Sequence, residues 1–231
     1  HYGGLKGMWK RFIQKKFEGK KRITFGTASF PTEAQKKLER ETKFSKDIKI
    51  SILVPLFNTP EKFLREMIDS VQYQTYGNWE LCLADGSDDK HREVGQIVAE
   101  YQKTDDRIKY RKIEKNLGIS GNTNICFEMA TGDYIGLFDH DDILHPSVLF
   151  ESMKKICDEG ADYVYCDEAT FQSPDINDII VLHFKPDYSK DNLRANNYIC
   201  HFSVFAKELL QQTELFRSAY DGSQDHDMIL R

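Results

Sequence analysis

The chain has 231 residues, of which 40% are hydrophobic and 30% are charged, and its formal net charge at pH 7 is −5. This length allows one large domain with a full core. No apolar run approaches the roughly 20 residues of a membrane-spanning helix, and no signal peptide is evident, so we expect neither a membrane-spanning nor a secreted protein. The five cysteines form no C-x-x-C pair, which favours a reducing compartment, and we expect a cytoplasmic protein.

The charge is unevenly distributed along the chain. Residues 1–25 carry eight basic side chains and one acidic one, so the remainder of the chain holds a net charge of −12. Apolar and aromatic residues recur at helical spacing in this segment, namely Leu5, Met8, Trp9, Phe12, Ile13 and Phe17. Such a helix is typical of a peripheral contact with the inner face of the cell membrane. A helix packed on the domain or on a partner subunit fits the same pattern. The acidic remainder argues against nucleic acid as a partner.

The pattern of apolar runs predicts one fold. We expect the basic helix and a linker over residues 1–46, with a short helix at 32–42, and a domain over residues 47–231 that is truncated at its C-terminal side. Strands are predicted at 48–54, 79–84, 108–113, 133–138 and 162–166, and helices after Pro60 and at 88–102, 120–130 and 146–158. Four successive strand and helix steps indicate an α/β fold, with a mostly parallel sheet and helices on both faces.

Local signals mark some of the predicted boundaries. Thr59 is expected to cap the helix that starts at Pro60, and Gly132 is expected to close the helix at 120–130. The predicted buried face of the first of these helices consists of Phe63, Leu64, Met67, Ile68 and Val71. After residue 167 we expect a helix at 189–196, a strand at 198–206 and a last helix that ends at Arg231.

Polar residues follow the predicted strands at the edge where ligands of parallel sheets bind. The first four strands run into Asn58, into Asp85 and the Asp88–Asp89 pair, into Asn116, and into the sequence Asp139-His140-Asp141-Asp142. One pocket is expected to collect these four ends. For Asp88 and Asp89 a simpler role as helix-capping turn residues is favoured.

Two of the carboxylates suggest a metal site. In extended backbone Asp139 and Asp141 share one face, while His140 points away. Two carboxylates on one face suit Mn²⁺ or Mg²⁺, whose remaining ligands are commonly phosphate oxygens, so a phosphorylated ligand is expected. His140 and His145 are not favoured as metal ligands, because loop histidines more often cap helices or face solvent.

Five stretches in order carry a family resemblance: SILVPLFN, LADGSDD, NLGISGNTN, GLFDHDD and GSQDHDMILR. Over about residues 48 to 231 they resemble the family 2 glycosyltransferases of the GT-A fold, especially bacterial enzymes that build cell-surface polysaccharides such as capsule and cell wall. The resemblance implies transfer of a sugar from a nucleotide-diphosphate donor to an acceptor hydroxyl, with inversion at the anomeric carbon. The acceptor would be a saccharide or a lipid-linked saccharide.

The resemblance also implies roles for individual residues. The nucleotide would be bound by Pro55, Phe57, Asn58, Asp85, Asn116, Gly118, Gly121 and Asp139. Asp85 would accept the imide N–H of the base, which favours a UDP- or dTDP-sugar. Asp141, with Asp139, would hold the Mn²⁺ or Mg²⁺, and Asp225 would be the catalytic base. The chain departs from the family pattern at Thr123, where an Arg is frequent, and at Gln224, where Glu is usual.

The acceptor side is less sharply marked. Asp167 and Glu168 follow the fifth predicted strand, and His183, Asn197 and His201 lie in the stretch that resembles the acceptor region of the family. Functional and packing roles are equally favoured for these five residues. Two other functions fit parts of the sequence: a D-x-D phosphatase, in which the acidic motif normally follows the first strand, and a non-catalytic nucleotide-sugar-binding module of a larger synthase. Asp225 argues against the second.

Overall fold

The computed structural model describes residues 30–171, 179–200 and 202–231. The basic helix predicted at 1–25 and the candidate acceptor residue His201 lie outside these residues. The described chain falls into two compact units, one made of residues Phe30–Glu168 and His183–Arg231 and the other including Ala169–Leu182. In the part of the chain that the structure describes, no helix has the length and apolar character needed to cross a membrane.

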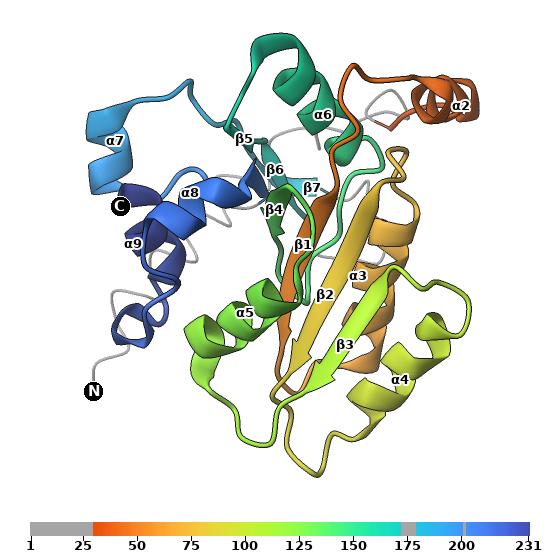
Figure 1. The fold of residues 1–231 in the computed structure, drawn as a ribbon, viewed down its shortest axis with the longest axis vertical. Coiled ribbons are helices and arrows are strands. Elements are labelled where there is room, and N and C mark those ends of the chain that lie inside the picture. The colour runs from red at the N-terminus through yellow and green to blue at the C-terminus, as the bar shows by residue number, and fades with distance from the viewer. Residues whose placement is uncertain (1–29, 172–178, 201) are drawn as a thin grey trace, which may run out of the picture. The chain divides into compact units, whose positions relative to one another are not determined.

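The larger unit is built on a six-stranded sheet with the strand order β3-β2-β1-β4-β8-β5 (Figure 1). Strand β1 pairs in parallel with β2 and β4, and β2 pairs in parallel with β3, whereas β8 runs antiparallel to its neighbours β4 and β5. The strands are β1 Ile50–Leu56, β2 Trp79–Asp85, β3 Ile108–Lys112, β4 Tyr134–Leu137, β5 Tyr163–Tyr165 and β8 Ser203–Ala206. The predicted mostly parallel sheet is therefore confirmed.

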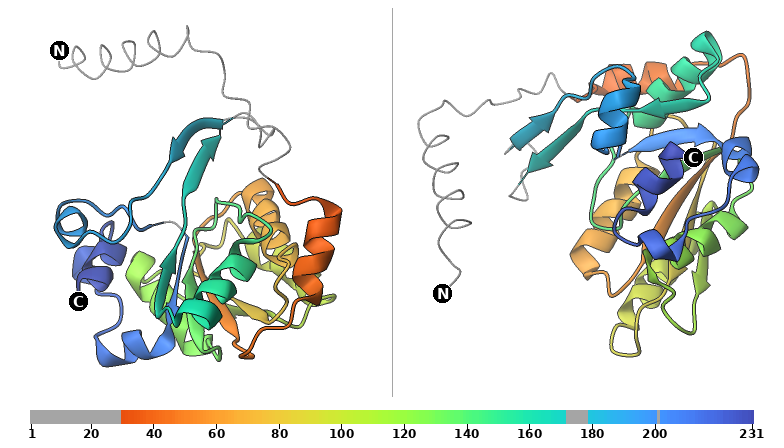
Figure 2. Two further views of the ribbon diagram at one scale, coloured as in Figure 1. Left: turned by 90° about the horizontal axis from the view of Figure 1, so that it is seen from above. Right: turned by 90° about the vertical axis from the view of Figure 1, so that its left-hand side faces the viewer.

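Helices cover both faces of the sheet, as predicted (Figures 1 and 2). Successive side chains of β1 point to opposite faces of the sheet and so contribute to two hydrophobic clusters. Ile50, Ile52 and Val54 pack in the first cluster, and Leu53 packs in the second. The first cluster includes residues of α3 Glu61–Gln72, α4 Glu93–Gln102 and α6 Val148–Glu159. The second includes residues of α5 Gly118–Met129, α8 Lys207–Gln212 and α9 Gln224–Leu230. The α9 helix is thus part of the domain core and reaches the sheet from the far end of the described sequence.

Helix α2, Glu33–Glu41, confirms the short helix predicted before the domain, and Thr32 forms a capping box with Gln35. The segment is packed on the domain and is not a separate linker. Glu39 accepts hydrogen bonds from Thr75 Oγ1 at 2.6 Å and from Ser147 Oγ at 3.1 Å. The compact unit accordingly begins at Phe30, so the boundary predicted at residue 47 cuts through these contacts.

Three short elements complete the described chain. They are α7 Lys190–Ala195, the 3₁₀ helix η2 Ser218–Tyr220, and a two-stranded sheet of β6 Glu168–Phe171 and β7 Ile179–His183. The apolar run predicted as a strand at 198–206 pairs only over β8, because Tyr198, Ile199 and Phe202 are instead buried as loop side chains.

Several predicted helix boundaries are wrong. Helix α3 has Pro60 as its N-cap residue, and Thr59 caps nothing, since its buried Oγ1 has no hydrogen-bond partner among the described residues. Phe63 was predicted in the buried face of α3, but it is 40% exposed, and the other four predicted residues are buried. Gly132 does not close α5. Its role is close approach, because a Cβ there would lie 2.5 Å from the carbonyl oxygen of Lys49.

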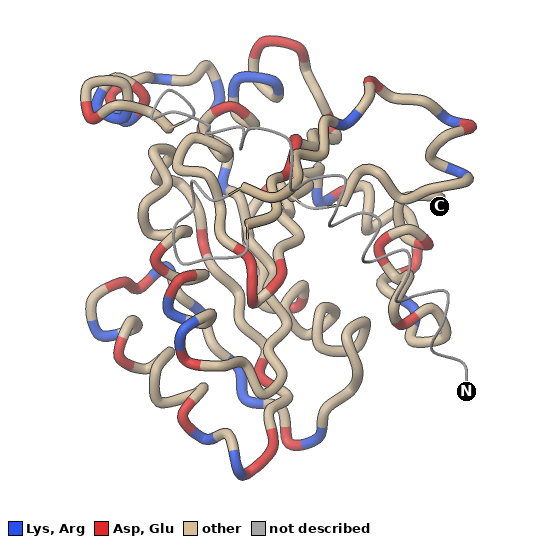
Figure 3. The backbone as a smooth tube through the Cα atoms, turned by 180° about the vertical axis from the view of Figure 1, so that it is seen from behind, with Lys and Arg blue, Asp and Glu red and all other residues tan. Residues whose placement is uncertain are grey.

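One buried carboxylate, Glu80, lies at the amino end of β2 and links it to the neighbouring strands β1 and β3. It accepts hydrogen bonds from Ser51 Oγ at 2.6 Å and Thr131 Oγ1 at 2.8 Å, and it pairs with Lys109 Nζ at 2.6 Å and Lys49 Nζ at 3.3 Å. Burial opposes ionisation, but these donors outweigh it and lower the pKa of Glu80 to about 2. Among the other charged residues of the described chain, Asp85 is also buried. Helix α2 carries charges of both signs along its short length (Figure 3).

Candidate active site

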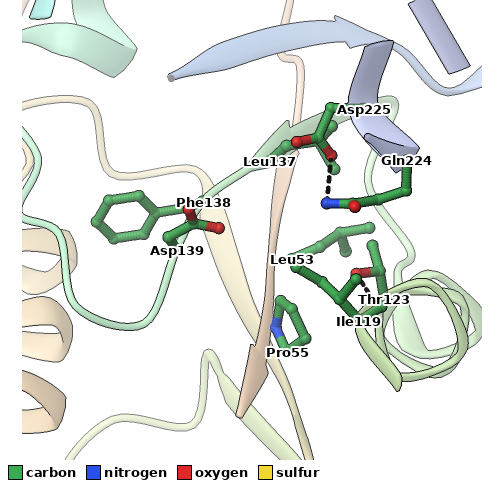
Figure 4. Close-up of a pocket in the computed structure, with 9 residues that line it drawn as sticks. All are labelled: Leu53, Pro55, Ile119, Thr123, Leu137, Phe138, Asp139, Gln224 and Asp225. Atoms are coloured by element: carbon green, nitrogen blue, oxygen red, sulfur yellow. Dashed lines mark hydrogen bonds between the residues drawn. The ribbon is translucent and has the colours of Figure 1, made fainter. Parts of the chain in front are cut away.

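A small pocket opens at the carboxyl ends of β1 and β4 and encloses about 240 Å³ of space, including some open solvent. Figure 4 shows its lining, which comes from β1, α5, the end of β4 and the start of α9. The lining residues are Leu53, Pro55, Ile119, Thr123, Leu137, Phe138, Asp139, Gln224 and Asp225. Two carboxylates from distant parts of the sequence, Asp139 and Asp225, therefore share one pocket.

The backbone after β4 determines where Asp139 lies. The Phe138 N–H donates to the carbonyl oxygen of Leu53 at 3.2 Å, and the Phe138 ring packs edge-on against Phe202. These contacts fix the chain just before Asp139, which is partly buried at the pocket. Residues 140 and 141 then form a turn, so the extended geometry predicted for Asp139 and Asp141 is wrong, and the exposed Asp141 does not line the pocket.

The two acids nevertheless offer a suitable donor set for a hard cation. Within the described ranges, no three His, Cys, Asp or Glu side chains are grouped as a metal cage. Mn²⁺ and Mg²⁺ bound beside phosphates need only one or two carboxylates, because phosphate and water oxygens complete the shell. The exposure of Asp141 leaves room for such ligands. In number and type, Asp139 and Asp141 match the protein ligands of a phosphate-assisted site, and they are too few for an all-protein one.

The first turn of α9 directs neighbouring side chains to different partners. Asp227 is bound by Arg217, with Nε at 3.0 Å, and by Arg231 Nε at 3.3 Å, and hydrogen bonding to Arg217 lowers the pKa of Asp227. His226 Nε2 contacts the carbonyl oxygen of Leu193 at 2.5 Å. Asp225 lines the pocket instead. Of the two aspartates, Asp225 thus faces the pocket, whereas Asp227 binds the arginines that hold α9.

A set of hydrogen bonds joins α5 to the segment before α9. Asn124 exchanges two hydrogen bonds with the backbone of Phe216, at 2.8 and 3.0 Å, and the Ser120 N–H donates to Asp221 Oδ1 at 3.2 Å. Gly118 has φ +77°, and a Cβ on it would clash with Asp221 Oδ2. These contacts hold the α5 wall of the pocket against the segment that leads into α9, and they put Gly118 beside Asp221.

The residues that follow β1, together with the end of β2, form a hydrogen-bonded rim outside the pocket lining. Asp85 is 1% exposed, and its carboxylate accepts from the Ser87 N–H at 2.8 Å and from Tyr110 Oη at 2.6 Å. Asn58, at φ 50°, accepts from the Asp88 N–H at 3.0 Å. Asp88 also accepts from the Lys90 N–H, so it closes a local turn and does not cap α4 as predicted. Asp85, which ends β2, and Asp88, which follows it, do not line this pocket.

After β3, the side chain of Asn116 is hydrogen-bonded to groups in the following segment. Asn116 Oδ1 accepts from Asn122 Nδ2 at 2.9 Å and from the Gly118 N–H at 3.1 Å. A Cβ on Gly121 would lie 2.5 Å from the Cβ of Leu117. Of the residues predicted to bind the nucleotide, only Pro55 and Asp139 line this pocket. Phe57, two residues after Pro55, is exposed.

Two of the predicted acceptor residues in the described chain, Asp167 and Glu168, contact Lys185. Asp167 Oδ1 accepts from the Lys185 N–H at 2.7 Å, and Lys185 Nζ lies 3.2 Å from Glu168 Oε2. Asn197 Nδ2 contacts Cys200 Sγ at 3.2 Å, and His183 is exposed. None of these four lines the pocket. Conversely, Ile119 and the supporting Tyr110 were not predicted, since no local pattern marks them.

Comparison with known proteins assigns the family. A sequence model described as "Glycosyl transferase family 2" matches residues 51–213. The chain belongs to glycosyl transferase family 2. The fold of this glycosyltransferase is the GT-A type, which confirms the resemblance seen in the sequence.

Two curated relatives share most of this glycosyltransferase chain. The uncharacterized protein y4gI of Sinorhizobium fredii is 39% identical over 183 residues, which are 79% of the chain and 20% of y4gI. The O-antigen biosynthesis protein RfbC of Myxococcus xanthus is 30% identical over 194 residues, which are 84% of the chain and 15% of RfbC. The chain thus spans a fifth or less of the length of these two relatives.

Two solved structures share the fold of the glycosyltransferase. Residues 1–349 of S. aureus TarS in complex with UDP superpose with a TM-score of 0.62 at 20% identity, over 78% of this chain and 54% of that one. The mannosyltransferase PcManGT of Pyrobaculum calidifontis, in complex with GDP-Man and Mn²⁺, superposes with a TM-score of 0.55 at 18% identity, over 84% and 57%.

Proposed function

We propose that this family 2 member is a metal-dependent, inverting hexosyl- or deoxyhexosyltransferase that uses a UDP- or dTDP-sugar in bacterial polysaccharide synthesis. The observation that carries the proposal is the shared pocket of Asp139 and Asp225 at the carboxyl edge of the sheet. The name of RfbC, an O-antigen biosynthesis protein, and the UDP bound to TarS support the acceptor class and the donor class.

The chemistry follows from where charge develops. The acceptor hydroxyl oxygen attacks the anomeric carbon while the bond from that carbon to the diphosphate oxygen breaks, and the carbon becomes oxocarbenium-like between them. Asp225 accepts the hydroxyl proton as the new bond forms, and the nucleoside diphosphate leaves with the bonding electrons. Attack from the side opposite the leaving group inverts the configuration.

Asp141 and Asp139 would hold Mn²⁺ or Mg²⁺ at the diphosphate, and Asp139 would also lie near the ribose. A bound cation of this kind acts as a Lewis acid that neutralises charge on the departing diphosphate. The Mn²⁺ in PcManGT supports this class of metal. The carboxylates that follow β4 repel one another unless a positive charge is nearby, and the cation that binds with the donor would supply that charge.

The rim around β1, β2 and α5 would bind the nucleoside through Pro55, Phe57, Asn58, Asp85, Asn116, Gly118 and Gly121. In this role the Asp85 carboxylate accepts a hydrogen bond from the imide N–H of uracil or thymine. The same carboxylate already accepts hydrogen bonds from Ser87 and Tyr110. Each carboxylate oxygen can accept more than one hydrogen bond, so these internal donors are compatible with a base.

The acceptor, a saccharide or lipid-linked saccharide, would approach past Asp167, Glu168, His183, Asn197 and His201. We further propose a cytoplasmic enzyme whose basic segment 1–25 contacts anionic lipid at the inner face of the membrane. Its cationic and apolar sequence pattern supports this contact.

Thermal shift and turnover of a panel of UDP- and dTDP-sugars, with and without Mn²⁺, test the proposal. A donor that binds raises the melting temperature by mass action. Metal-dependent stabilisation together with release of UDP or dTDP supports the enzyme. Stabilisation without any turnover supports a non-catalytic binding module, and hydrolysis of a simple phosphomonoester without a sugar donor supports a D-x-D phosphatase.

A further inference from the structure

Gln224, the neighbour of the proposed base, is bound at both ends of its side-chain amide. It is 6% exposed and lines the same pocket as Asp225. Its Oε1 accepts a hydrogen bond from the Gly222 N–H at 2.8 Å, and its Nε2 donates to Asp225 Oδ1 at 3.2 Å (Figure 4). The side chain therefore connects a backbone turn to the carboxylate.

The backbone determines which end of the amide faces Asp225. A backbone N–H can only donate, so the Gly222 N–H requires the oxygen end of Gln224. The amino end must then point to the carboxylate, which can only accept when it is ionised. Gly222 has φ +89°, a left-handed conformation that favours glycine and turns this N–H toward the start of α9.

Charge explains why an amide suits this position. The pocket already contains the carboxylates of Asp139 and Asp225. A glutamate at position 224, as in the resembling family pattern, would set a third carboxylate against Asp225 Oδ1 and provide no donor when ionised. Glutamine keeps the shape, removes the repulsion and supplies a hydrogen bond to a charged group, which is among the stronger kinds.

We propose that Gln224 is a positioning residue that holds the Asp225 carboxylate in the plane required to receive the acceptor proton. The inference rests on the proposed role of Asp225 as the base and assigns its orientation to a second residue. Gln224 acts through the carboxylate and not on the donor, so its loss should reduce kcat and leave donor binding intact.

The test combines Gln224→Met, Gln224→Glu, Asp225→Asn and the double variant Gln224→Met/Asp225→Asn in the full-length protein. Turnover of the active UDP- or dTDP-sugar gives kcat and KM, and UDP titration with Mn²⁺ verifies that each variant retains a folded nucleotide site. We expect both Gln224 variants to lower kcat by roughly 10- to 100-fold, with KM for the donor within about twofold of wild type.

The double variant separates positioning from a general structural role. If Gln224 acts through Asp225, adding Gln224→Met to Asp225→Asn should cause no further loss, because the base is already absent. Wild-type kcat in Gln224→Met, or an equal further loss in the Asp225→Asn background, would overturn the inference while leaving Asp225 as the base. Wild-type turnover by Asp225→Asn alone would instead overturn the proposed function, and the role of Gln224 with it.

Discussion

The hydroxyl of Tyr110 donates a hydrogen bond to Oδ2 of the buried Asp85 across 2.6 Å, from one strand to its parallel neighbour. Gly95 on α4 makes room for it, since a Cβ there would lie 2.6 Å from that hydroxyl. Burial, followed by the bond to Asp85, raises the pKa of Tyr110, so the hydroxyl stays protonated and available as a donor.

Tyr110→Phe tests this pair. Removing the hydroxyl leaves a buried carboxylate with one donor fewer, so we expect a loss of about 1–3 kcal/mol in unfolding free energy. If Asp85 reads the base, affinity for UDP should also fall. Urea unfolding and UDP titration measure the two effects. The matched control is Tyr101→Phe, which removes a hydroxyl from Asp69 at 2.9 Å and should leave UDP affinity unchanged.

Asp225→Asn tests the base. The substitution keeps shape but removes the basic oxygen, so we expect near-normal UDP and Mn²⁺ binding and a fall in transfer rate on the order of 10²–10⁴-fold. Asp227→Asn is the control on the same helix turn. It should lower the melting temperature, because Asp227 is bound by Arg217 and Arg231, and it should affect the rate much less. A larger rate effect at Asp227 would contradict the assignment.

The metal role of the acidic turn predicts sensitivity to chelation. We expect EDTA to abolish turnover and Mn²⁺ or Mg²⁺ to restore it, and we expect Asp141→Asn to weaken donor binding strongly without altering the melting temperature of the ligand-free protein. Asp89→Asn, at an exposed site outside the pocket, serves as the control. Full activity in EDTA would rule out the metal-dependent mechanism.

Glu80 predicts a specific acid sensitivity. Its folded-state pKa of about 2 lies below the ordinary value of 4.5, so its contribution to stability is complete above pH 4.5 and is lost as pH falls toward 2. Glu80→Gln should lose roughly 1–3 kcal/mol at pH 7, because Lys49 and Lys109 then face a neutral group. Between pH 7 and pH 3 the unfolding free energy of wild type should drop more than that of the variant. Equal drops would show that Glu80 has no such role.

The basic segment predicts lipid binding. Each well-placed cationic side chain near anionic lipid contributes about 1 kcal/mol, and the aromatic face adds apolar burial. We expect the protein to sediment with vesicles containing phosphatidylserine and to remain in the supernatant with phosphatidylcholine alone. Deletion of residues 1–25 should abolish sedimentation. Unchanged binding by the deletion variant would favour a packing role for this segment.

The sequence predicted the helices and strands better than the contacts between distant residues that join them. The β-branched run of β1 and the helical spacing of α3 suffice because each depends on neighbours in sequence. The turn at 140–141 comes directly after Phe138, whose ring packs on Phe202, and local sequence does not reveal such a contact between distant residues. Likewise, Asp85 was expected in the common pocket. Its hydrogen-bond donor Tyr110 lies on another strand, β3. The sequence pattern of β3 does not identify this partner, and Tyr110 is only partly buried.

The origin of the pocket lining has a consequence for folding and biosynthesis. Pro55 and Asp225 come from near opposite ends of the described chain, and the bonds between α5 and the segment before α9 also join residues 101 and 92 positions apart. Contacts of such high sequence separation form slowly, because a large loop must close first. A nascent chain can pair β1 with β2 early, but the pocket stays open on one side until α9 emerges and docks. Activity should consequently appear only late in refolding, after most of the helical and strand signal has returned.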